Sequence, residues 1–109
     1  MNITLDSISP NDQLLIRTQN SEYRFSILDA EERRGTLSGG TLGEQARDAV
    51  LVGTLSENNN SPDNVSMGLK TGRRALFYLA ARNGVERLIT SAITSVARNK
   101  KHEDEKRAA

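Results

Sequence analysis

The segment from Leu14 to Leu28 constrains the fold of this chain more than any other, because apolar and polar residues alternate along it on both sides of Gln19-Asn20-Ser21. A period of two residues is that of a β-strand with one buried and one solvated face, and two such runs joined by short polar residues predict a β-hairpin. The residues expected on the buried face are Leu14, Ile16, Tyr23, Phe25 and Ile27. Those expected to face water are Arg17, Glu22 and Arg24.

Length and composition restrict both the architecture and the chemistry. A chain of 109 residues can bury one modest core, so we expect a single domain. It has no Cys, and its only His, His102, lies in a charged run near the C-terminus, which excludes thiol chemistry, disulfides and nearly all zinc arrangements. No secretory signal and no segment of membrane-spanning length is visible, so we expect a cytoplasmic protein without a membrane partner. We also expect no cofactor.

Charge is distributed unevenly along the chain. The formal net charge is +1, but the five basic and three acidic residues from Arg98 onward contribute +2, so residues 1–97 carry −1. A fold that binds nucleic acid usually has a clear basic excess, because counterion release supplies much of the affinity. We predict a small barrel domain over residues 1–97 and a flexible charged tail over residues 98–109.

Short apolar runs separated by turn residues predict further strands after the hairpin. They cover residues 33–37, 49–56, 65–69 and 75–82. The clearest loop is ENNNSPDN at residues 57–64, which has only turn-forming and polar residues. The Gly39-Gly40 pair predicts backbone at positive φ or a bulge, and Gly53 predicts a bulge or a close approach of backbone.

The segment after Asn83-Gly84 supports two interpretations. The dipeptide is a strong hairpin signal when both residues occupy the centre of a tight turn at positive φ, and the residues after it fit two strands, 85–91 and 92–96. An amphipathic helix fits the spacing of the apolar residues as well. Those residues are Val85, Leu88, Ile89, Ala92, Ile93, Val96 and Ala97. The sequence of this segment does not distinguish the two strands from the helix.

Five short motifs follow one another along the chain. They are Asn20-Ser21-Glu22-Tyr23, Ser38-Gly39-Gly40, Leu51-Val52-Gly53-Thr54, Leu69-Lys70-Thr71-Gly72 and Ile89-Thr90-Ser91-Ala92-Ile93. Their order resembles a group of uncharacterised bacterial small β-barrel proteins that have an N-S-x-Y hairpin, a glycine pair and a closing T-S-x-[VI] strand. The chain departs from that group at Ala92, where proline is expected. The resemblance covers about residues 14–97, implies a compact barrel closed by a C-terminal strand, and implies no reaction, ligand or site.

Candidate catalytic groups are sparse. Five carboxylates lie in expected turns or connections, where exposed charges are common: Asp29, Glu31, Glu32, Glu44 and Asp48. A serine nucleophile has no histidine base within residues 1–97, so we expect no enzymatic activity and rank a small hydrolase below binding functions. The glycines between Gly35 and Gly43 are not followed by Gly-Lys-Ser/Thr, so turns and bulges explain them better than a phosphate loop. The four aromatic residues, Tyr23, Phe25, Phe77 and Tyr78, are more typical of a core than of a base-stacking surface.

Arginines are the strongest binding candidates. In each of the pairs Arg33-Arg34 and Arg73-Arg74, one side chain points outward if the segment is extended, and neighbouring guanidinium groups can hold a phosphate or a carboxylate. The structural alternative is that these charges protect an edge strand from aggregation. Together with Arg87, the two pairs form the predicted binding set.

The sequence therefore predicts an all-β fold, a small SH3-like barrel of five to seven strands with a mobile charged C-terminal tail. The alternative is an α+β fold with C-terminal helices. The function we expect is a non-enzymatic binding or protein-interaction module that uses an exposed sheet edge or the arginine-bearing face. The alternative is a nucleic-acid-binding small barrel that uses Arg73, Arg74, Arg87 and the tail lysines Lys100 and Lys101.

Overall fold

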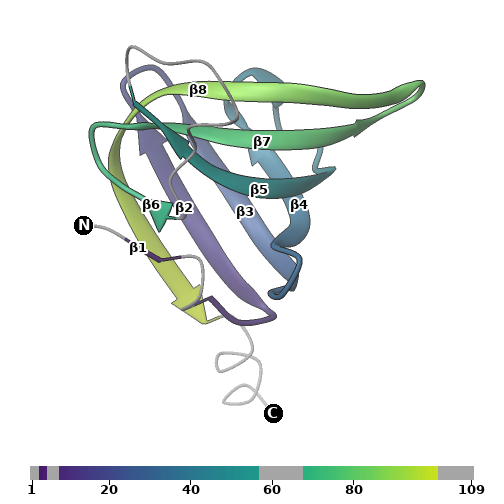
Figure 1. Cartoon of the computed structure of the whole chain (residues 1–109), viewed down its shortest axis with the longest axis horizontal. Helices are drawn as coiled ribbons and strands as arrows, with labels where there is room; N and C mark the ends of the chain where they lie inside the picture. Colours follow the sequence, from purple (N-terminus) through teal and green to yellow (C-terminus); the bar gives the residue numbers. More distant parts are fainter. Residues whose placement is uncertain (1–2, 5–7, 57–67, 101–109) are drawn as a thin grey trace.

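The segments with alternating apolar and polar residues form antiparallel β-strands, and these strands pair into a closed barrel. The computed structural model describes residues 3–4, 8–56 and 68–100. Within this part, six strands form a closed barrel in the order β2-β3-β4-β5-β7-β8, and β1 and β6 form a separate two-stranded sheet (Figure 1). The strands are β1 (Ile3–Thr4), β2 (Asp12–Thr18), β3 (Glu22–Asp29), β4 (Arg34–Gly39), β5 (Arg47–Leu55), β6 (Gly68–Leu69), β7 (Arg74–Ala81) and β8 (Gly84–Lys100). The predicted small all-β barrel is confirmed, and its strand number lies within the predicted range.

The predicted hairpin is formed by β2 and β3. Leu14 pairs with Phe25 and Ile16 pairs with Tyr23, and all five residues expected on the buried face are buried. Arg17, Glu22 and Arg24 are exposed, as predicted. The turn is held by Thr18, whose backbone N–H donates to the Ser21 carbonyl at 2.8 Å and whose hydroxyl accepts the Ser21 N–H at 3.1 Å.

The barrel interior is a single apolar core to which every barrel strand contributes. The rings of Phe25 and Phe77 meet edge to face with centroids 5.4 Å apart, and both side chains are fully buried. Gly35 packs closely against β3, because a Cβ built on it would collide with the Ser26 carbonyl. The close approach of β3 and β4 at this position therefore requires the absence of a side chain.

Two further glycine predictions are confirmed. Gly39 (φ 99°) and Gly40 (φ 51°) adopt positive φ at the end of β4, where a 3₁₀ turn at Gly40–Leu42 begins. The pairing of β5 with β7 shifts register between Leu51 and Gly53, so Gly53 lies at a bulge. The bulge bends β5 and increases its local twist.

The C-terminal helices of the α+β alternative are wrong, because the described residues from Arg74 onward form β7 and β8. The two separate strands predicted for residues 85–96 are also wrong, because β8 is one strand of 17 residues. Register shifts in both of its ladders interrupt the period of two, so that Ile93 pairs with Thr18 and Val96 with Ile16 on the inner face. Buried residues three positions apart, such as Ile93 and Val96, have the same spacing as the buried face of an amphipathic helix, which explains why the sequence also fits a helix.

The hairpin between β7 and β8 is confirmed, but its turn differs from the prediction. Ala81 pairs with Gly84, so Arg82 and Asn83 are the central residues, and neither has positive φ. Gly84 has a φ of 132° and is the first residue of β8. Gly84 therefore lies at the start of β8 and not at a central position of the turn.

The barrel also extends past the predicted boundary at Ala97. β8 continues through Lys100, which pairs with Asp12, and Arg98 pairs with Leu14. Residues 98–100 are therefore strand and not tail. The predicted tail from residue 101, the loop at 57–64, and Val65 and Met67 of the strand predicted at 65–69 lie outside the described residues.

Candidate functional site

The structure brings two of the predicted arginines onto one row across the barrel. Arg34 of β4 pairs with Val50 of β5, Val50 pairs with Tyr78 of β7, and Tyr78 pairs with Arg87 of β8. Directly opposed residues in an antiparallel ladder point to the same face. This face is the outer one, because Phe77, the neighbour of Tyr78 in β7, points into the core. Arg34 and Arg87 thus lie at the two ends of an outward row, about 14 Å apart across three strand spacings.

A depression of about 520 Å³ lies on this outer face, and we call it the outer groove. It is lined by Leu28, Arg34, Gly35, Asp48, Ala49, Val50, Tyr78, Leu79, Ala80 and Val85. Leu28 is 61% exposed and Val85 is 68% exposed, and they are the exposed large hydrophobic residues within the described part of the chain. Both line the outer groove, so its apolar surface is concentrated and not scattered.

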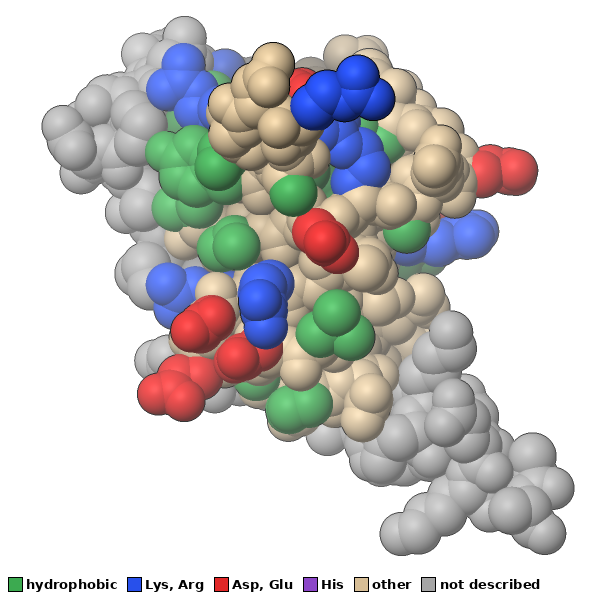
Figure 2. Space-filling model, turned by 90° about the vertical axis from the view of Figure 1, so that its right-hand side faces the viewer, with side chains coloured by type: hydrophobic (Ala, Val, Ile, Leu, Met, Phe, Trp, Pro, Cys, Tyr) green, Lys and Arg blue, Asp and Glu red, His purple; other side chains and the backbone are tan. Residues whose placement is uncertain are grey.

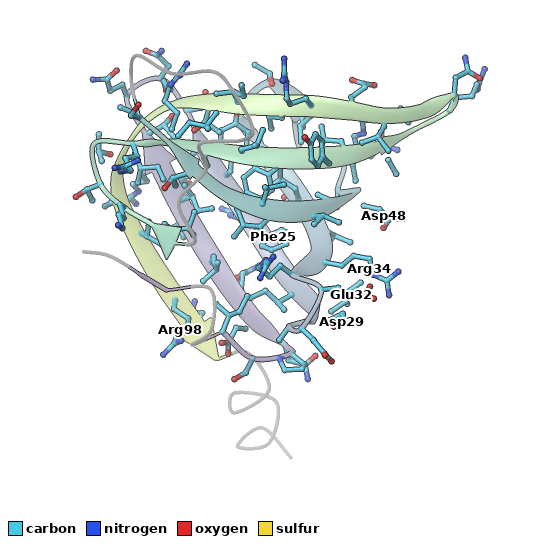
Figure 3. All side chains as sticks on the ribbon, viewed as in Figure 1. Phe25, Asp29, Glu32, Arg34, Asp48 and Arg98 are labelled. Atoms are coloured by element: carbon cyan, nitrogen blue, oxygen red, sulfur yellow. The ribbon has the colours of Figure 1, made fainter. Side chains whose placement is uncertain are left out.

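The charges around the outer groove are mixed. Arg34 is the ladder partner of Asp29, and Figure 3 shows Asp29, Glu32 and Asp48 beside it at one end of the barrel, with Arg98 on the other side. Figure 2 shows basic, acidic and hydrophobic side chains interspersed on the side toward which the β7–β8 hairpin projects. Neither Arg34 nor Arg87 forms an ion pair with another described residue.

The other predicted arginines do not join this row. Arg33 lies in the turn before β4 with a φ of 56°, and it is half-buried. Arg73 precedes β7, and Arg74 donates from its Nη2 to the Ser56 carbonyl at 3.1 Å. Arg74 pairs with Leu55, five residues along β5 from Val50, which is about 17 Å along the strand. The two arginine pairs therefore do not form one anion site.

A free strand edge adjoins the outer groove. β8 pairs with β7 from Gly84 to Ala92 and with β2 only from Ile93 onward. Among the described residues, no strand pairs with the second edge of β8 between Gly84 and Thr90. The hairpin of β7 and β8 projects beyond the ends of β4 and β5 (Figure 1). Its base is fixed by Arg47, which donates to the Ala80 carbonyl at 2.7 Å and forms an ion pair with Glu86 at 3.3 Å.

The candidate carboxylates do not all converge on one site, because Asp29, Glu32 and Asp48 lie beside Arg34 whereas Glu44 lies apart from them. Asp29 accepts the backbone N–H of Glu32 at 3.1 Å, which is a turn-stabilising contact. Asp48 lines the outer groove, whereas Glu44 lines a separate depression beside Gly39, Gly40 and Gly43. Within the described ranges, no group of three or more His, Cys, Asp or Glu residues is arranged to hold a metal ion.

The aromatic residues divide between the core and the surface. Tyr23, Phe25 and Phe77 are buried as predicted, but Tyr78 is half-buried on the outer face. Sequence reasoning did not identify Leu28, Val50, Tyr78 and Val85 as a common surface. One feature of the sequence could have indicated this surface. The segments that form β5 and β7 have apolar residues at successive positions, and because successive residues of a strand point to opposite faces, some of these apolar side chains must lie outside the core.

Comparison of the chain with protein-family models, with curated proteins and with solved structures finds no match. The resemblance to uncharacterised bacterial small barrels and the assignment to the SH3-like class stay predictions. No helix in the described part of the chain is long and apolar enough to cross a membrane.

Proposed function

We propose that this protein is a non-enzymatic interaction module that binds another protein through the outer groove. The observation that carries the proposal is the position of Leu28 and Val85, whose exposed side chains line the same depression. Exposed apolar surface rimmed by polar residues is typical of protein interfaces. Tyr78 at the centre and Arg34 at the rim are residue types enriched among the residues that dominate binding energy.

The distribution of charge favours a protein partner over nucleic acid. A nucleic-acid interface needs a continuous basic surface that follows the phosphates. Arg34 lies beside three acidic side chains, and the pair Arg73-Arg74 is about 17 Å away along the barrel. Apolar residues with flanking charges of both signs instead match the core and rim of a protein interface.

Site-specific photo-crosslinking tests the proposal. A photoreactive amino acid is introduced at Val85 or Leu28 in cells of the source organism, with Gln45, an exposed residue that does not line the outer groove, as the control position. We expect a discrete protein adduct from Val85 and Leu28 that is absent from Gln45 and is weakened by Tyr78→Ala. Adducts of equal yield from all three positions would refute the proposal.

A salt series of fluorescence anisotropy with labelled RNA and duplex DNA tests the alternative. The truncated control should end at Lys100 and not at Ala97, because residues 98–100 pair with β2. Binding that survives this truncation and falls steeply with salt would favour nucleic acid as the partner. No binding, or binding lost with residues 101–109, is the result expected for a protein-interaction module.

A further inference from the structure

The free edge of β8 offers backbone hydrogen-bonding groups without a partner strand. From Gly84 to Thr90 the strand pairs with β7 on one side only, as far as the described residues show. Natural proteins usually protect such an edge with Pro, Lys, a bulge or a short strand. This edge spans seven residues, GVERLIT, which have neither Pro nor Lys, and its charged residues are Glu86 and Arg87, which act against pairing with a strand of like charge. It is therefore suited to accept an added strand.

The side chains along this edge alternate in character. Leu88 pairs with the core residue Phe77 and Glu86 with Leu79, so both belong to the inner face. Val85, Arg87 and Ile89 belong to the outer face, in the order apolar, basic, apolar. Glu86 is paired with Arg47, whereas the guanidinium of Arg87 has no ion-pair partner among described residues.

We propose that the free edge of β8 binds an extended acidic peptide segment of the partner as an added β-strand. This inference rests on the proposed function and names the partner's chemistry. Directly opposed side chains in a ladder interact best when apolar residues face apolar ones and charges are opposite. A matching segment therefore has an Asp or Glu opposite Arg87 and apolar residues two positions away on each side. The pattern is the same in both strand directions.

A second copy of the chain fits this edge less well. Two β8 edges related by a two-fold axis pair antiparallel, and a register centred on Arg87 places the two Arg87 side chains opposite each other. A register centred on Glu86 opposes two carboxylates in the same way. Like charges directly opposite are destabilising, so Glu86 and Arg87 disfavour self-pairing while Arg87 favours an acidic strand.

Titration of the full chain with a synthetic peptide tests the inference. The probe is a capped peptide Ser-Val-Thr-Glu-Thr-Val-Ser, compared with the same peptide carrying Lys in place of Glu and with a version N-methylated at alternate residues. Binding is followed by ¹H–¹⁵N NMR at the amides of residues 84–90. We expect shifts at these amides, an affinity about fivefold lower for the Lys peptide, and loss of binding on N-methylation.

Charge-reversed variants test whether the charged residue of the peptide lies opposite Arg87. Arg87→Glu should invert the preference between the Glu and Lys peptides, and Arg82→Glu, in the exposed turn of the same hairpin, should leave it unchanged. Equal binding of the two charged peptides to the unmodified chain, undiminished binding of the N-methylated peptide, or no shift at residues 84–90 would overturn the inference. Concentration-dependent dimerisation with shifts at these amides in the absence of peptide would also overturn it in favour of self-pairing.

The two proposals can fail separately. If photo-crosslinking from Val85 and Leu28 succeeds and the peptide results are negative, the outer groove binds a protein but the edge of β8 does not add a strand. If the peptide binds the edge and the crosslinks fail, the strand-binding edge stands without the groove as the contact surface.

Discussion

The ion pair between Asp12 and Arg98 should make β2 and the end of β8 energetically dependent on each other. The Asp12 carboxylate is fully buried, accepts the Ser9 N–H at 2.9 Å and lies 4.0 Å from the Arg98 Nε, whose side chain is 31% exposed. Two unit charges at this separation attract by about 4 kcal/mol at an effective dielectric constant near 20. Removing one partner of a buried pair costs about 3–5 kcal/mol, and partial solvation of Arg98 reduces this.

We therefore expect Arg98→Ala to lower the free energy of unfolding by about 2–3 kcal/mol, because it leaves the Asp12 carboxylate buried without its cation. Asp12→Asn should cost about 1 kcal/mol, since the amide oxygen can still accept the Ser9 N–H. In the double variant no buried charge remains, so the combined loss should be smaller than the sum by at least about 1 kcal/mol.

Urea unfolding followed by far-ultraviolet circular dichroism measures all three variants, and the chain has no Trp to serve as a fluorescent probe. Arg24→Ala, an exposed arginine on the outer face of β3, is the matched control and should change stability by less than about 0.5 kcal/mol. Additivity of the two single losses within about 0.5 kcal/mol would refute the coupling between Asp12 and Arg98.

Three further substitutions and one truncation test the fold. Gly35→Ala should destabilise the barrel by about 3 kcal/mol in the same urea assay, because the new methyl group meets backbone of the neighbouring strand. Gly43→Ala, which has open space but a φ of 74°, should cost only about 1–2 kcal/mol, and the reverse order would contradict the packing argument. Phe77→Ala removes a fully buried ring and should cost about 3–5 kcal/mol, read as a lower urea midpoint; a loss below about 1 kcal/mol would show that the ring is not packed in the core. A chain ending at Ala97 should be less stable than one ending at Lys100 by thermal unfolding, and equal midpoints would contradict the role of residues 98–100 in β8.

Local sequence patterns were sufficient to predict the strands in the first half of the barrel. The alternation from Leu14 to Leu28 identifies both strands of the first hairpin and the face of each side chain, since neighbouring strands joined by a short turn need no information from elsewhere. The glycine pair after Ser38 identifies the end of β4 for the same reason. The helical alternative after Gly84 arose because the register shifts in β8 are imposed by β7 and β2, which lie elsewhere in the sequence.

The candidate site could be recognised only once the order of the strands in the barrel was known. The sequence marks Arg34 and Arg87 as separate candidates, but only the ladder from β4 through β5 and β7 to β8 places them on one outward row with Val50 and Tyr78. The sequence predicts the pairs Arg33-Arg34 and Arg73-Arg74 as binding residues because the members of each pair are adjacent. In a strand, adjacent residues point to opposite faces, so adjacency favours neither a shared surface nor a shared ligand.

The sequence by itself determined that the segment from Leu14 to Leu28 forms two strands with one apolar face each, where this hairpin turns, and that the chain has no cysteine thiol. Those properties depend on local spacing and residue type. The tertiary structure decided that β8 is one continuous strand, that its first half keeps an edge without a partner strand among the described residues, and that the outer groove collects Leu28 and Val85. These features depend on which distant segments pair, and closure of the barrel sets that pairing through packing of the shared core.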